Sequence, residues 1–135
     1  MKNSIIKAAK SLWNSMLLVF GTILLVSLII TLIPKSFYVE IFRGSIFDSL
    51  IGSAIGSISA GNPITSYIIG GELLEQGISL IAITAFIVAW VTVGIIQLPA
   101  ESMILGKKFA ILRNLTSFIF AIIVAMLTVA ILEVF

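Results

Sequence analysis

The residues best suited to bind a solute surround the tripeptide Gly61-Asn62-Pro63, which interrupts an apolar stretch of the chain. An asparagine amide offers two donors and an acceptor, and helix ends beside a break expose unpaired backbone groups. Hydroxyl side chains flank the tripeptide on both sides, at Ser57, Ser59, Thr65 and Ser66. Because residues 49–71 carry no charge, these groups predict a substrate-binding site for a small neutral solute, or for a cation held by carbonyl oxygens. The alternative is that Asn62 only supports a tight turn.

A second polar pair lies further along the chain. Gln97 and Glu101 are four positions apart across Pro99 and belong to the same candidate substrate-binding set. Both lie near the end of an apolar segment, where they could receive a solute or a proton. The structural alternative is the ordinary polarity of a helix end.

The stretch that must position the first site is residues 49–77, which the tripeptide divides into two arms. Each arm is roughly 20 Å long at the helical rise, whereas the hydrocarbon core of a bilayer is roughly 30 Å thick. Backbone groups freed at a break cannot face lipid, because each unsatisfied amide costs several kcal/mol there. The stretch therefore predicts a helical hairpin with a polar tip at membrane depth; a re-entrant hairpin and two short crossings both fit.

Small residues recur every four positions before the break, at Gly52, Gly56 and Ala60. In a helix they form one smooth face, which allows a second helix to approach closely. This face predicts helix packing rather than solute contact. We expect it to bring two copies of the chain together.

Composition places the chain among integral membrane proteins of the all-α class. Of its 135 residues 60% are hydrophobic and only 10% are charged, against roughly 25% charged in soluble domains. Cysteine and histidine are both absent, which excludes disulfides, thiolate or imidazole metal sites and histidine-dependent catalysis. No nucleophile paired with a base remains, so we expect neither an enzyme nor a metal or other cofactor. Nucleic acid is not an expected partner, because the small basic excess is explained by membrane topology.

A single transmembrane domain over residues 1–135 follows from the apolar blocks: three full transmembrane helices plus the broken hairpin. The expected order is a cytoplasmic amino terminus (1–11), a first membrane helix (12–33), an interfacial segment (35–48), the hairpin (49–77), a second membrane helix (78–98), a cytoplasmic loop with a short surface helix (99–113) and a last membrane helix (114–133). Basic residues cluster before the first helix and in the 99–113 loop. Since lysine and arginine accumulate on cytoplasmic flanks, both clusters are expected in the cytoplasm, in a multi-pass protein of a prokaryotic cell membrane.

Several motifs in the last two thirds of the chain resemble a known family. They are the small-residue run into Gly61-Asn62-Pro63, the segment Leu73-Leu74-Glu75-Gln76-Gly77-Ile78-Ser79, then Ala85-Phe86, and finally Leu105-Gly106-Lys107-Lys108. These features resemble the predicted permeases of bacteria and archaea that include the organoarsenical exporters. The resemblance implies a permease built from two similar halves, of which this chain would be one. A similar hairpin also occurs in nucleoside-recognition, gate-type domains, which compete as a family.

The expected function is a half-size permease subunit that encloses a small-solute pathway as a dimer. Three spanning helices and a hairpin are too few to enclose a path, so the partner is a second copy or a homologous half. The competing interpretation is an accessory or structural membrane subunit that packs against a larger protein. The sequence does not indicate the substrate.

Overall fold

The computed structural model describes residues 2–32, 34–42, 47–59 and 61–135, and this part of the chain folds into α-helices without a strand. The helices are α1 (Lys2–Leu32), α2 (Lys35–Ile41), α3 (Phe47–Ile58), α4 (Pro63–Glu75), α5 (Leu80–Thr92), α6 (Leu98–Leu105) and α7 (Lys107–Val134). They belong to two compact units, Met1–Pro34 and Lys35–Phe135. The all-helical class is therefore confirmed.

The first unit is one long helix, α1, which begins at Lys2 rather than near residue 12. Its stretch Ser4–Ile29 is long and apolar enough to cross a membrane. Hydroxyl groups are accommodated by bonding to carbonyls one turn earlier: the Ser15 hydroxyl donates to the Ser11 carbonyl at 3.0 Å, and that of Thr31 donates to the Ser27 carbonyl at 2.7 Å. Such side-chain bonds within the helix reduce the cost of a hydroxyl in apolar surroundings.

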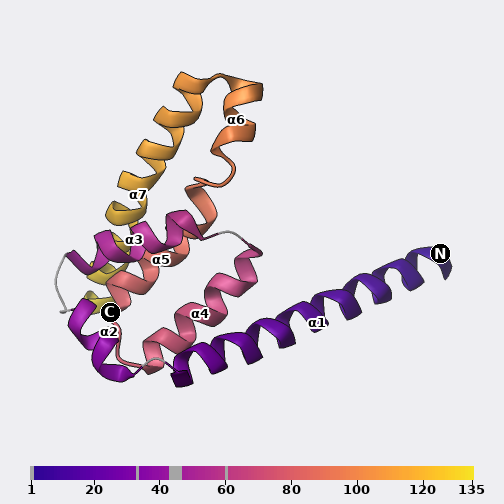
Figure 1. Cartoon of the computed structure of the whole chain (residues 1–135), viewed down its shortest axis with the longest axis horizontal. Helices are drawn as coiled ribbons and strands as arrows, with labels where there is room; N and C mark the ends of the chain where they lie inside the picture. Colours follow the sequence, from indigo (N-terminus) through magenta and orange to yellow (C-terminus); the bar gives the residue numbers. More distant parts are fainter. Residues whose placement is uncertain (1, 33, 43–46, 60) are drawn as a thin grey trace. The chain divides into compact units, whose positions relative to one another are not determined.

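The second unit is built around α5, which packs against α3, α4 and α7 (Figure 1). Its small residues Ala82, Ala85 and Ala89 are fully buried. They recur at three- and four-residue intervals, so they line the helix where its neighbours approach. Alanine at these positions keeps the interhelical distance short.

The glycine face of α3 packs against α5 within the same chain. A Cβ atom at Gly52 would overlap the carbonyl oxygen of Ala82, and one at Gly56 would overlap that of Phe86. The two glycines thus pack within one chain, and because α5 already covers this face, it is not available to join two copies as expected. Ala60, the third residue of the predicted face, lies outside the described residues.

Helix α7 also turns small side chains inward. Its buried residues are Ala110, Asn114, Ala121 and Ala125. Ala121 forms an apolar cluster with Ala89 and Val93, flanked by Val88 and Phe118. Alanine side chains thus line the contact of α5 with α7, which allows the helix backbones to lie close together.

The two arms of the predicted hairpin both exist, as α3 and α4, but they do not form a self-packed pair. Within the described part of the chain, each arm makes its extensive contacts with α5 instead. For α4 this contact includes Gly70, where a Cβ would lie 3.0 Å from Ile87 Cδ1. The two arms are thus short helices that are each laid on α5.

The end of α4 follows directly from its sequence. Gly77 has a φ of 89°, the N–H of Gly77 donates to the Leu74 carbonyl at 2.9 Å, and that of Ile78 donates to Leu73 at 3.2 Å. This is the Schellman arrangement, which needs a left-handed residue that glycine supplies at little cost. The accompanying apolar contact is present, because Leu73 packs on the cluster that contains Ile78.

The predicted second membrane helix, residues 78–98, is wrong as a full span. Helix α5 has 13 residues and ends at Thr92, so it is roughly 20 Å long and short of the roughly 30 Å core. The sequence Val91-Thr92-Val93-Gly94 explains the end, since β-branched residues and glycine disfavour helix. Two helices in the described ranges, not three, are long and apolar enough to cross a membrane: Ser4–Ile29 and Lys107–Val134.

The region after the break partly follows the prediction. The short helix expected before Gly106 is confirmed as α6, and Gly106 ends it with a φ of 88°. The last helix, however, already begins at Lys107 rather than at Asn114, so the second half of the predicted 99–113 loop is helical. Helix α2 occupies part of the predicted interfacial segment, of which residues 43–46 lie outside the described ranges.

Candidate functional site

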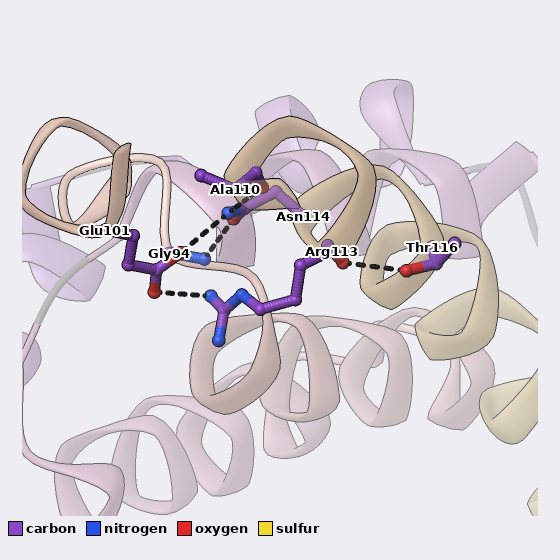
Figure 2. Close-up of polar contacts among 6 residues, drawn as sticks. All are labelled: Gly94, Glu101, Ala110, Arg113, Asn114 and Thr116. Atoms are coloured by element: carbon purple, nitrogen blue, oxygen red, sulfur yellow. Dashed lines mark hydrogen bonds and ion pairs between the residues drawn. The ribbon is translucent and has the colours of Figure 1, made fainter. Parts of the chain in front are cut away.

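The break between α5 and α6 holds a polar arrangement that involves α7 as well. After Thr92 the backbone is extended at Val93, and the N–H of Gly94 donates to Asn114 Oδ1 at 2.7 Å (Figure 2). Asn114 lies on α7 and is only 5% exposed. A backbone group released at the end of α5 is thus satisfied by a side chain from another helix.

The amide nitrogen of Asn114 completes the arrangement. It donates to Glu101 Oε2 at 3.2 Å and to the Ala110 carbonyl at 3.0 Å. Asn114 therefore uses its acceptor and both of its donors at once, as a buried amide must to offset its desolvation. One side chain connects the break after α5, the helix α6 and its own helix α7.

Glu101 also forms an ion pair. Its Oε1 lies 2.7 Å from Arg113 Nη2, and both side chains are partly buried. The pair balances the two charges, so the cluster of Gly94, Glu101, Arg113 and Asn114 (the break cluster) carries no net charge. Arg113 Nε is buried without a hydrogen-bond partner among the described residues.

Gln97 and Glu101, the second candidate pair, are both at this break. The backbone carbonyl of Gln97 accepts the N–H of Glu101 at 3.0 Å, and the backbone N–H of Gln97 donates to the Gly94 carbonyl at 3.0 Å. The Gln97 side chain lies against Gly94, where a Cβ would be 3.0 Å from Gln97 Oε1. The structure thus brings the pair together around a glycine.

Asn62, the first candidate, is the N-cap of α4. Its Oδ1 accepts the N–H of Ile64 at 3.0 Å, and Pro63 begins the helix. This is the favoured use of asparagine and proline at a helix start. The local structural role foreseen as the alternative is therefore present, while the exposed side chain leaves its role in solute binding a prediction.

The hydroxyl groups predicted around Asn62 do not converge on it. Ser57 donates to the Ser53 carbonyl at 2.6 Å, Ser59 to Ile55 at 2.7 Å and Ser66 to Pro63 at 2.7 Å. Each hydroxyl thus bonds within its own helix, where the carbonyl three or four residues back is always in reach. Ser57 and Ser66 are buried, and Thr65 is partly buried.

The two breaks lie at the same end of α5. Trp90, one helical turn before Gly94, donates from Nε1 to the Gly61 carbonyl at 3.5 Å. Its ring packs edge-on against Phe86, with the ring centroids 5.4 Å apart. Trp90 therefore connects the Gly61-Asn62-Pro63 break to the helix end that leads into the break cluster.

Sequence reasoning missed Asn114 and Gly94 as partners and treated Arg113 only as a topology signal. One available signal was an asparagine at the start of an apolar helix, where a buried amide needs partners. A further missed contact joins the start of α3 to that of α5: the Ser79 hydroxyl donates to the buried Asp48 Oδ2 at 2.9 Å. The Ser53 hydroxyl, which is fully buried further along α3, has no hydrogen-bond partner in the described structure.

Searches with family models, against curated proteins and against solved structures find no match to this chain. The resemblance to permeases therefore stays a prediction. Across the residues that the structure describes, no three acidic side chains gather where they could hold a metal ion. The features of the chain that bear on function are the breaks at Gly61-Asn62-Pro63 and Gly94 and the helices beside them.

Proposed function

We propose that the chain is a half-size membrane permease subunit whose solute pathway passes the breaks at Gly61-Asn62 and Gly94. The observation that carries the proposal is that these two breaks meet at one end of α5 through Trp90 and Gly61. Broken helices concentrate polar backbone groups, and irregular backbone at membrane depth is tolerated only where it is buried or lines a watery cavity.

Helix lengths support this placement. Helices α3, α4 and α5 have 12, 13 and 13 residues, and each is roughly 20 Å long. If α3 and α4 enter from the same side, the break between them lies about two thirds of the way through a core of roughly 30 Å. The end of α5 reaches the same depth, and the remaining distance is crossed by the break cluster and α6.

The chemistry of the site favours a small neutral solute. Charges at the break cluster are balanced between Glu101 and Arg113, and the segment around Asn62 is uncharged. The exposed Asn62 amide provides hydrogen-bonding groups. A solute that has lost part of its hydration would regain hydrogen bonds there.

A second copy or a homologous half completes the pathway in this proposal. The glycine face of α3 is covered by α5, so the dimer must use another surface. The outward apolar side chains of α7, such as Leu115, Ile119 and Ile123, are exposed in the single chain. They face lipid or the second half.

The test is solute entry into vesicles that contain the purified full chain. Glycerol, urea and ribose serve as neutral probes, with light scattering as the readout. We expect at least one probe to equilibrate faster than in protein-free vesicles, and Asn62→Ala to slow it while Asn14→Ala, an exposed asparagine on α1, does not. Protein-free rates for all three probes with folded protein would contradict a neutral-solute pathway, and obligatory co-purification with a larger protein would favour the accessory-subunit alternative.

A further inference from the structure

The connection between α6 and α7 exposes large apolar side chains next to two lysines. Met103 is 88% exposed and Ile104 is 82% exposed, and Leu105 and Phe109 are more than half exposed. We call residues 103–109 the elbow. Figure 1 shows α6 beside the amino-terminal end of α7, with the elbow at the end of the helix pair. Large apolar side chains that are exposed to water next to one another are unfavourable, so we expect another molecule to cover the elbow.

The charge of the elbow indicates what covers it. Lys107 and Lys108 open α7 and are both exposed. The carboxylate of α6, Glu101, is already paired with Arg113 at 2.7 Å. Among the described residues neither lysine lies within 4.0 Å of a carboxylate. The elbow therefore presents apolar side chains together with two uncompensated positive charges.

The position of the elbow along α7 matches the surface of a bilayer. Asn114 on α7 accepts a hydrogen bond from Gly94, and the proposed placement sets that break roughly 10 Å inside the hydrocarbon core. Residues 107–113 extend the same helix by about 10 Å, which places the lysines at headgroup depth. Apolar side chains beside them then reach the acyl boundary, as in amphipathic segments that lie in the interface.

We propose that the elbow is a docking surface for anionic phospholipid headgroups, with Lys107 and Lys108 on the phosphates and Met103 and Ile104 in the acyl boundary. This inference rests on the membrane placement of α7 in the proposed function. It adds a lipid partner that the solute pathway does not require. Each lysine near an anionic leaflet favours binding by about five-fold, equivalent to about 1 kcal/mol.

The test uses the absence of native cysteine. A single Met103→Cys, labelled with a polarity-sensitive fluorophore, reports the surroundings of the elbow in the full chain. The protein is reconstituted in phosphatidylcholine vesicles with and without phosphatidylglycerol, and a lipid-attached shallow quencher measures contact with the headgroup region. Ile123→Cys, labelled in the same way and read with a deep quencher, reports whether α7 is embedded at all.

We expect the Met103 label to be quenched more strongly when phosphatidylglycerol is present, and less at high salt. Lys107→Gln/Lys108→Gln should remove this difference, weakening elbow binding by roughly 25-fold if both lysines contribute. Lys7→Gln/Lys10→Gln, which removes the same charge from α1, should keep it.

Four results would overturn the inference. Equal quenching in neutral and anionic vesicles shows apolar insertion without headgroup recognition. A Met103 label shielded from both the lipid quencher and aqueous iodide shows that protein covers the elbow. A quenched Ile123 label with a water-exposed Met103 label defeats the lipid surface alone. An Ile123 label that escapes the deep quencher but is reached by aqueous iodide defeats the membrane placement of α7 and the proposed function with it.

Discussion

The side-chain oxygen of Asn114 lies 2.7 Å from the backbone nitrogen of Gly94, so α7 supplies the hydrogen-bond partner that the end of α5 lacks. The same amide donates to Glu101 on α6. Removing this one side chain would therefore leave the Gly94 N–H without its partner and take one hydrogen bond from Glu101. The first prediction follows from this contact.

Asn114→Ala should destabilise the protein by about 1 to 3 kcal/mol, because a buried N–H and a carboxylate lose a partner. Thermal unfolding in mild detergent measures the change. Asn14→Ala, at an exposed position of α1, is the matched control and should stay within about 0.5 kcal/mol of wild type. Equal melting of the two variants would show that the Gly94 contact contributes nothing.

Glycine-to-alanine substitutions should have opposite signs on α3 and α4. At Gly52 the new Cβ meets the backbone of Ala82, which cannot move aside as a flexible side chain would. Gly52→Ala should cost about 1 to 3 kcal/mol through overpacking. At Gly71 nothing lies within 4 Å of the new Cβ, so Gly71→Ala should stabilise α4 by up to about 1 kcal/mol. Thermal unfolding of both variants in the same detergent measures the two changes in stability. Stabilisation by Gly52→Ala would argue against the close α3–α5 contact.

The cap and binding roles of Asn62 can be separated by choice of substitution. Aspartate and serine also cap helices well, whereas alanine costs about 1 kcal/mol. Asn62→Ser should therefore keep the melting temperature of wild type and Asn62→Ala should lower it. If the exposed amide also binds solute, Asn62→Ser should still slow solute entry into vesicles. Wild-type entry by Asn62→Ser, with lower stability for Asn62→Ala, would reduce this residue to a helix cap.

Membrane topology is tested by single cysteines introduced into the cysteine-free chain. Those at Asn3 and Lys108 should react with an impermeant thiol reagent only from the cytoplasm, and one at Lys35 only from outside, because lysine-rich flanks stay inside. Labelling of intact and permeabilised cells distinguishes the sides. Opposite sidedness of positions 3 and 108 would contradict the even number of membrane crossings expected between them, and labelling of each site from both sides would indicate dual topology.

Local structure was largely determined by the sequence. Asn62 and Pro63 begin α4, Gly77 ends it and Gly106 separates α6 from α7, as their residue types predict. These features depend on the dihedral angles and hydrogen bonds of a few neighbouring residues. The helical class and the long apolar helix before Glu133 follow equally directly from composition and length.

Only the tertiary structure decided which surfaces meet. A face of small residues fits any closely approaching helix, so the spacing of Gly52 and Gly56 identified a contact surface but not that α5 covers it. The residue at which α5 ends was not predicted either, because it lies within a continuous apolar run. The helix can end before Gly94 because Asn114, distant in sequence, accepts a hydrogen bond from the Gly94 N–H. Partners of this kind are set by the packing of helices in three dimensions, which a local pattern of residues does not encode.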